Sequence, residues 1–234
     1  MRVLGRDLVD PFDEFWETVS HELPVESGDI ERGLSSVFGD QGIEFSAPAT
    51  PRWMALPDDD LAYHVAHELT HVLMRERGYP KTVRGVGYPP DSAEARVGED
   101  LEEMALHPSL ESILEPFGFR HDFIASNMAA GAMRGLKSAP VPEYGTPWHF
   151  TWAIRFCMLQ MELPLELWSP LEIIYAERAP AVTGLGRELA QILTDAGWGS
   201  PEKALDAMVR SRDVLGLDVQ DKVLVLDPTT GRVM

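Results

Sequence analysis

Two histidines and a glutamate stand together in the segment His67-Glu68-Leu69-Thr70-His71. In a helix, a spacing of four places the imidazoles of His67 and His71 on one face, where both can bind one tetrahedral metal ion. Glu68 is displaced around the helix, from where its carboxylate can reach a water molecule bound to that ion. The ion would lower the pKa of the water, and Glu68 would accept its proton as the water attacks a carbonyl carbon. The pattern predicts a zinc-dependent hydrolase, with His67 and His71 as ligands of Zn²⁺ and Glu68 as the general base.

The motif falls within a segment that should form an amphipathic helix from about Asp59 to Arg77. Pro57 and the aspartates that follow it are typical of a helix start, because carboxylates interact favourably with the positive end of the helix dipole. Gly78 and Pro80 are typical of a helix end. The apolar residues expected on the buried face are Leu61, Val65, Leu69 and Val72.

A catalytic zinc site needs a third protein ligand and an open position for water. The next predicted helix, Ala93–Leu106, offers several carboxylates and is followed by His107. We favour His107 as the third ligand, with Glu103 and Asp100 as carboxylates that orient its imidazole. Two alternatives stay open. Glu103, Asp100 or Glu94 can serve as the ligand instead, or His107 can be a cation that complements the C-terminal end of the helix dipole.

The run Val65-Ala66-His67-Glu68-Leu69-Thr70-His71-Val72-Leu73 resembles the active-site helix of the zincin (HExxH) metallopeptidases. It continues through Arg77-Gly78-Tyr79-Pro80, Leu106-His107-Pro108 and Leu114-Glu115-Pro116-Phe117-Gly118-Phe119, and this combination resembles an uncharacterised group of bacterial zincin-like proteins. The resemblance covers roughly residues 58–119 of 234. It implies a bound zinc ion, Glu68 as the general base, and a peptide or protein as the substrate.

Other polar residues are candidates for contacts with the substrate. Tyr144 and His149 lie beside a proline-rich loop and can donate hydrogen bonds to the oxyanion of a tetrahedral intermediate, although packing explains these aromatic residues equally well. His121 is a further candidate donor. His64 either donates a hydrogen bond within the site or is partly exposed, and we favour exposure. In zincins a strand near the active-site helix often pairs with the substrate, a role that the resemblance assigns to the extended run Arg52–Leu56.

Composition limits the possible partners. The formal net charge of -18 gives a surface that repels phosphate backbones, so we expect no nucleic-acid partner. No long uncharged apolar stretch and no secretory signal pattern occur, so we expect no membrane partner and a cytoplasmic protein. The single cysteine, Cys157, lies in an apolar run and is expected in the core. The oligomeric state is left open.

Helical patterns alternate with proline and glycine breaks along most of the chain, and they are joined by a few extended runs. The extended runs at 42–47 and 52–56 together predict one hairpin, and the run at 222–226 with the turn residues 227–231 predicts a terminal hairpin. The glycine and proline residues of 81–90 predict a loop. The further predicted helices cover 10–22, 29–38, 109–119, 126–138, 148–161, 164–179, 186–196 and 201–212.

We therefore expect a predominantly helical α+β fold. Residues 1–138 would form a zincin-like metal-binding unit with a small β hairpin, and 139–234 a helical C-terminal part that ends in a short hairpin and packs on the first as one domain. Two other functions fit the same sequence: a catalytically silent zinc-binding protein with a regulatory or protein-interaction role, and a metal-free helical binding module. The presence of Glu68 favours the enzyme.

Overall fold

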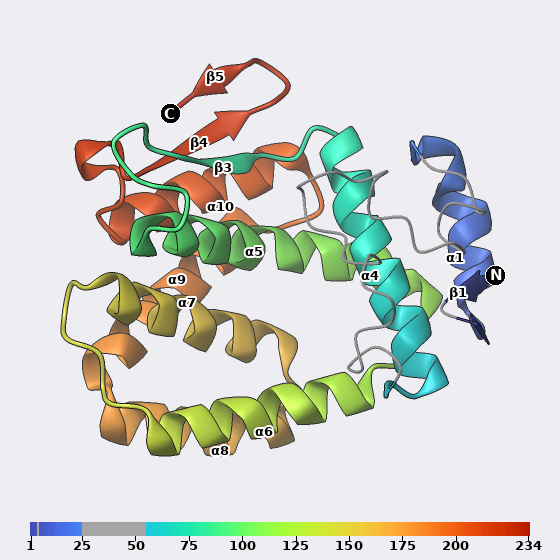
Figure 1. The fold of residues 1–234 in the computed structure, drawn as a ribbon, viewed down its shortest axis with the longest axis horizontal. Helices are drawn as coiled ribbons and strands as arrows, with labels where there is room; N and C mark the ends of the chain where they lie inside the picture. Colours follow the sequence, from blue (N-terminus) through green and yellow to red (C-terminus); the bar gives the residue numbers. More distant parts are fainter. Residues whose placement is uncertain (4, 25–54) are drawn as a thin grey trace. The chain divides into compact units, whose positions relative to one another are not determined.

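The computed structural model describes residues 1–3, 5–24 and 55–234, and helices make up most of this part of the chain (Figure 1). Its strands form one two-stranded and one three-stranded antiparallel sheet. The predicted, predominantly helical α+β fold is confirmed. The predicted helix at 29–38, the run at 42–47 and residues 52–54 of the second run lie outside the described residues. No helix among the described residues is both long and apolar enough to cross a membrane.

The chain divides into two compact units. The first contains residues 1–77 and 110–124, and the second contains 78–109 and 125–234. Helix α5 (Ala93–Leu114) carries the chain from the second unit into the first, and α6 (Asp122–Ser138) carries it back. The expected organisation into a part up to residue 138 and a helical C-terminal part stays a prediction.

In the first unit, helix α1 (Phe12–Val19) packs against helix α4 (Asp58–Glu76). The 3-10 helix η1 (Ser20–Glu22) extends α1, and strands β1 (Arg2–Val3) and β2 (Arg6–Asp7) precede it. The predicted helix at 10–22 is therefore confirmed. An ion pair of 2.7 Å between the Arg77 guanidinium and the Glu22 carboxylate links the end of η1 to the residue that follows α4.

Helix α4, which carries the histidine motif, has the predicted position and the predicted buried face. It begins after Pro57, with aspartates in its first turn, and ends at Glu76 before Gly78, whose φ of 78° favours glycine. Asp60 is buried, and its carboxylate accepts a hydrogen bond of 2.8 Å from the Ile124 backbone N–H in the first turn of α6. The predicted core residues Leu61, Val65, Leu69 and Val72 are all buried.

Helix α5 is longer than predicted, because Pro108 lies inside it without ending it. A proline removes one hydrogen bond from a helix but has a φ that fits the helix, so the neighbouring turns can continue. The 3-10 helix η3 (Glu115–Phe117) follows, and Gly118 ends it in the left-handed conformation with a φ of 70°. His107 consequently lies inside a helix and not at its C-terminus, which removes the alternative role of a cation at the helix end.

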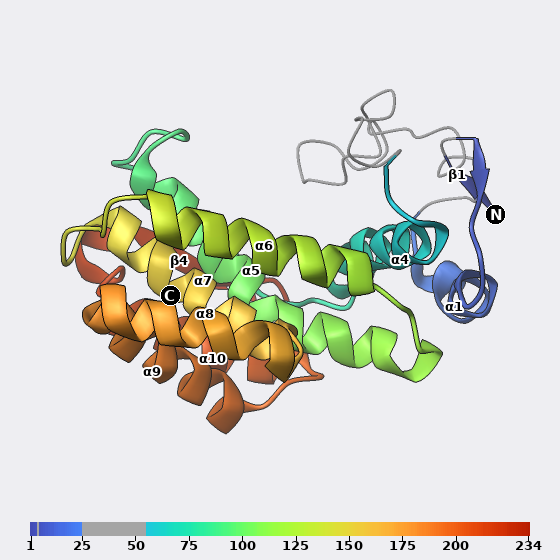
Figure 2. The same ribbon diagram turned by 90° about the horizontal axis from the view of Figure 1, so that it is seen from below.

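Four helices of the second unit pack together (Figure 2). Helix α9 (Pro180–Ala196) contacts α7 (Pro147–Glu162), α8 (Leu165–Arg178) and α10 (Pro201–Val214). These four helices confirm the helices predicted between residues 148 and 212. Cys157 of α7 is fully buried, as expected, and burial raises the pKa of its thiol. The aromatic side chains packed edge to face within this core are Trp152, Phe156, Trp168 and Tyr175.

Gly186 of α9 lets that helix approach α7 closely. A Cβ atom at this position would lie 2.7 Å from Cγ of Phe156, closer than real Cβ contacts allow. We expect Gly186→Ala to lower the free energy of unfolding by about 1–3 kcal/mol, because the added methyl group overpacks the core. Gly184→Ala is the matched control, since a Cβ there meets nothing within 4 Å and should stabilise the helix by about 0.5–1 kcal/mol. Urea unfolding measures the free energy of unfolding of both variants. Equal values for the two would contradict the close approach of Gly186 to Phe156.

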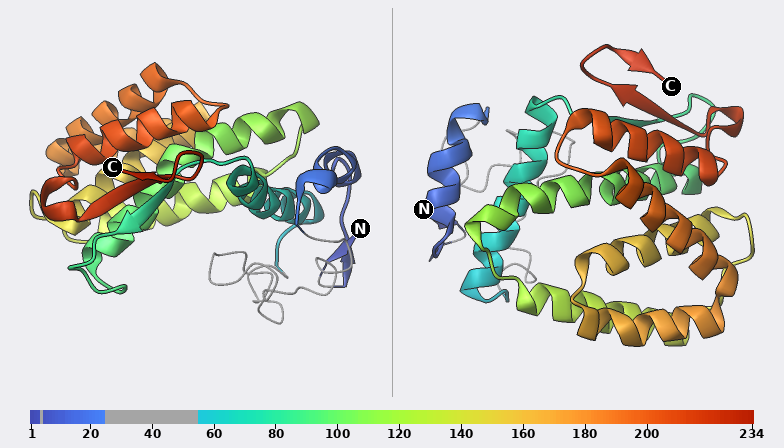
Figure 3. Two further views of the ribbon diagram at one scale, coloured as in Figure 1. Left: turned by 90° about the horizontal axis from the view of Figure 1, so that it is seen from above. Right: turned by 180° about the vertical axis from the view of Figure 1, so that it is seen from behind.

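The three-stranded sheet contains one strand that the sequence did not predict. Strand β3 (Lys81–Arg84) pairs with β4 (Val223–Asp227), which also pairs with β5 (Arg232–Val233), and β4 contacts α10 (Figure 3). The C-terminal hairpin is confirmed, whereas the predicted loop at 81–90 is wrong at its first four residues. They form a strand because they pair with β4, and Glu102 of α5 also accepts hydrogen bonds from the Thr82 N–H and hydroxyl. The local sequence did not indicate this strand, since β4 lies far along the chain.

Candidate metal centre

The imidazoles of His67 and His71 project from consecutive turns of α4 toward one another. Their Nε2 atoms lie 3.2 Å apart, and the ring planes are 73° from parallel. Two nitrogen ligands of a tetrahedral zinc ion, each at about 2.0–2.1 Å from it, are themselves about 3.3 Å apart. The spacing of the two Nε2 atoms therefore fits two ligands of one ion.

The other ring nitrogen of His67 faces a hydroxyl and a carboxylate. Nδ1 of His67 lies 3.4 Å from the Tyr63 hydroxyl oxygen and 3.7 Å from Oε1 of Glu111. The Tyr63 hydroxyl donates a hydrogen bond of 2.6 Å to the same carboxylate oxygen. An acceptor at Nδ1 favours the tautomer whose Nε2 has a free lone pair, which is the form that binds a metal ion.

Tyr63 and Glu111 were not predicted as site residues. Tyr63 stands four residues before His67 on the same helix face, so its spacing was a usable signal. Glu111 lies on α5 beyond Pro108, and no local spacing connects it to the motif. His121, predicted as a possible oxyanion donor, stacks on the Tyr63 ring with a centroid distance of 4.2 Å, and its buried Nδ1 has no hydrogen-bond partner among the residues that the structure describes. Its role in stabilising an oxyanion stays a prediction.

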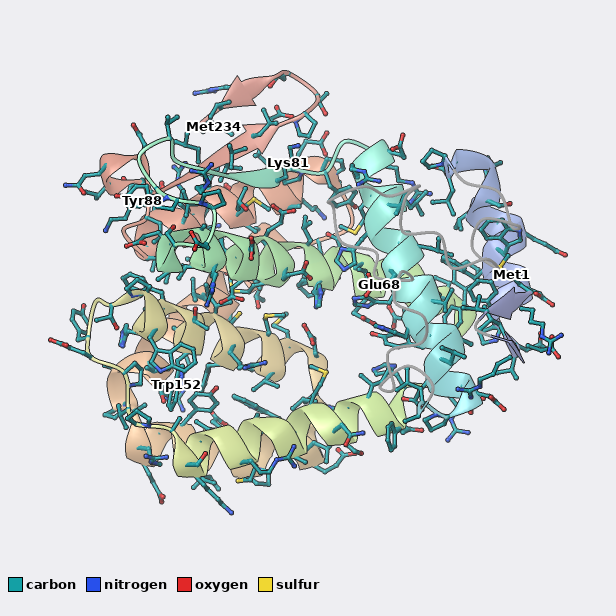
Figure 4. All side chains as sticks on the ribbon, viewed as in Figure 1. Met1, Glu68, Lys81, Tyr88, Trp152 and Met234 are labelled. Carbon is teal, nitrogen blue, oxygen red and sulfur yellow. The ribbon has the colours of Figure 1, made fainter. Side chains whose placement is uncertain are left out.

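Glu68 lies midway along α4 (Figure 4). Its side chain is 18% exposed, so the carboxylate is neither deeply buried nor free in solvent. Its Oε1 atom lies 4.0 Å from Nδ1 of His64, whose partly exposed side chain agrees with the expectation for that histidine. The role of Glu68 as the general base stays a prediction.

His107 of α5 belongs to a group of three histidines that could hold a metal ion. One ligand atom from each of His67, His71 and His107 lies within 4.8 Å of the other two. Three histidines are therefore close enough to bind one metal ion. Among the alternative ligands, Glu94 lies in the first turn of α5, more than three turns from His107, and Glu103 lies one turn before it.

Both ring nitrogens of His107 contact carboxylates. Nδ1 lies 2.7 Å from Oε1 of Glu162, and Nε2 lies 2.8 Å from Oε2 of Glu103. Burial alone would lower the pKa of His107, but the hydrogen bonds to Glu103 and Glu162 outweigh it and raise the pKa to about 10. Glu103 thus contacts His107 as expected.

The second carboxylate beside His107 differs from the one that the sequence suggested. Asp100 was expected to contact the His107 imidazole, but it accepts a hydrogen bond of 2.8 Å from the Thr151 hydroxyl. Glu162 contacts the imidazole instead. Glu162 is the last residue of α7. No local pattern links it to His107, because the two residues meet only through the packing of their helices.

The two aromatic candidates for substrate contacts have opposite environments. Tyr144 is 81% exposed, whereas His149 is 1% exposed, and their ring centroids lie 5.0 Å apart. Both ring nitrogens of His149 lack a hydrogen-bond partner within the described part of the chain, and burial lowers its pKa. Their proposed contacts with an oxyanion or a substrate stay a prediction.

The comparisons with known proteins find no protein similar to this chain. The chain matches no protein-family model, no curated protein and no solved structure. What can be said of function therefore depends on the side chains of α4 and α5.

Proposed function

We propose that this chain is a zinc-dependent hydrolase of the zincin type that cleaves peptide bonds. His67, His71 and His107 would hold the metal ion, and Glu68 would act as the general base. The observation that carries the proposal is the 3.2 Å separation of the two Nε2 atoms on α4, with Glu68 placed between them in sequence.

The donor set supports zinc. Three imidazoles are the ligands of one well-known type of catalytic zinc site, and three protein ligands leave the fourth position of a tetrahedron open for water or substrate. When bound, the ion supplies Lewis-acid chemistry that brings the pKa of a coordinated water molecule toward neutrality. Tyr63 and Glu111 would hold the His67 ring with Nε2 directed away from them.

Glu68 would accept a proton from water as the water attacks the carbonyl carbon of the peptide bond. The same carboxyl group would then donate that proton to the leaving amine nitrogen. The side chain of Glu68 is partly exposed, so a water molecule can reach its carboxylate. The peptide as substrate class comes from the resemblance of α4 to the zincin active-site helix.

Removal and return of the metal ion tests the reaction. The zinc-reconstituted protein is incubated with a mixed pool of peptides, and new peptide termini are identified by mass spectrometry. We expect cleavage products with the zinc-loaded protein, none after treatment with a chelator, and their return when zinc is added again. A protein that holds zinc yet cleaves no more than the chelated sample would be a zinc-binding protein without hydrolase activity, and the proposal would be wrong.

A further inference from the structure

The two carboxylates beside His107 have different surroundings. Glu103 stands one helical turn before His107 on α5, and its side chain is 50% exposed. Glu162 comes from the end of α7, and its side chain is 16% exposed. The distances to the imidazole are nearly equal, 2.8 Å for Glu103 and 2.7 Å for Glu162, whereas the exposures of the two side chains differ.

A histidine binds a metal ion through one ring nitrogen only, and that nitrogen cannot at the same time donate a hydrogen bond to a carboxylate. One of the two carboxylates must therefore leave the ring when His107 becomes a ligand. The carboxylate that remains would hold the other nitrogen, as carboxylates do for metal-binding histidines in many proteins.

We propose that Glu162 is the positioning residue of His107: it holds Nδ1 while Nε2 binds the metal ion, and Glu103 releases Nε2 to make that possible. This inference rests on the proposed function, because it needs a metal ion at His107. It assigns opposite roles to two glutamates that contact the same ring.

The difference in exposure decides which carboxylate leaves. The half-exposed Glu103 can turn into solvent, where water replaces its hydrogen bond at little cost. The Glu162 side chain is less exposed than that of Glu103, 16% against 50%, so less water can replace its hydrogen bond and breaking that contact costs more. The end of α7 is also held firmly, because the Leu163 backbone N–H donates to the Leu159 carbonyl and the helix packs against α9.

Zinc affinity in the two glutamine variants tests the proposal. Glu162→Gln and Glu103→Gln each remove one negative charge beside the same imidazole, so each serves as the control for the other with respect to general electrostatics. Competition with a chromophoric chelator should show affinity about 10- to 100-fold weaker for Glu162→Gln, the usual effect of losing an orienting carboxylate. Glu103→Gln should stay much closer to the wild-type affinity. An equal loss in both variants, or a larger loss in Glu103→Gln, would overturn the assignment.

Failure of this inference can be distinguished from failure of the proposed function by adding His67→Ala to the same titration. If wild type and His67→Ala bind zinc equally, the metal centre itself is wrong. If they differ and Glu162→Gln binds as wild type does, only the role of Glu162 is wrong.

A measurement on the wild-type protein avoids any variant that folds poorly. Nitrogen-15 NMR of the histidine side chains, recorded before and after zinc addition, should show that Nδ1 of His107 keeps its proton, whereas Nε2 releases its proton to solvent and binds zinc. The reverse pattern, with Nδ1 bound to zinc, would contradict the proposal. Thermal melts of the metal-free variants would show that they are folded in the zinc titrations.

Discussion

Replacement of Glu68 with glutamine is expected to slow peptide cleavage by the zinc-loaded protein by about 100- to 10,000-fold, the range that general base catalysis contributes. An amide has nearly the shape of a carboxylate but cannot accept a proton from water. Because the Glu68 side chain is partly exposed, the substitution should leave α4 folded. Initial rates on one peptide from the pool, together with the zinc content of each sample, measure the effect.

The matched control is Glu76→Gln, which makes the same change of charge at the last residue of the same helix, where the side chain is 45% exposed. It should cleave at the wild-type rate. A Glu68→Gln protein that holds zinc and retains the wild-type rate would show that Glu68 is not the base. A similar loss in Glu76→Gln would indicate a general effect of charge on α4.

The loss of either motif histidine should have the largest effect on metal binding. We expect His67→Ala and His71→Ala each to weaken zinc binding by more than about 100-fold, because loss of a ligand exceeds the 10- to 100-fold effect of losing a residue that only orients one. Each variant removes one of the two Nε2 atoms that lie 3.2 Å apart. Competition with a chelator measures the affinity, and the zinc that remains after dialysis gives an independent value.

His64→Ala is the control for these variants. His64 lies on the same helix one turn before His67, and its ring centroid is 6.5 Å from that of His67. It is not one of the three proposed ligands, so its loss should leave zinc affinity within a few-fold of wild type. If His64→Ala loses as much affinity as His67→Ala, the ligands have been assigned to the wrong face of α4.

Helix α4 was predictable because its signals are local. Pro57, the aspartates after it and Gly78 mark the two ends, and the apolar residues between them recur at helical spacing. The same spacing placed His67 and His71 side by side. The continuation of α5 through Pro108 was less predictable, since a proline often ends a helix and only contacts with the rest of the protein decide whether the next turn forms.

What the sequence did not predict depends on contacts between distant segments. Strand β3 forms on a partner at the other end of the chain, and its own residues lack the alternation that indicates a strand. Glu111 and Glu162 reach histidines through the packing of helices, which no spacing encodes. Asp100 was expected beside His107 because it lies nearly two turns before it on the same helix, but its carboxylate contacts Thr151 of α7 instead.

Elemental analysis of the purified protein, after reconstitution with zinc and dialysis, tests the central claim most directly. The close approach of the two motif imidazoles and the presence of His107 predict about one tightly bound zinc ion per chain. Zinc far below one per chain after reconstitution would contradict the metal centre and, with it, the proposed hydrolase.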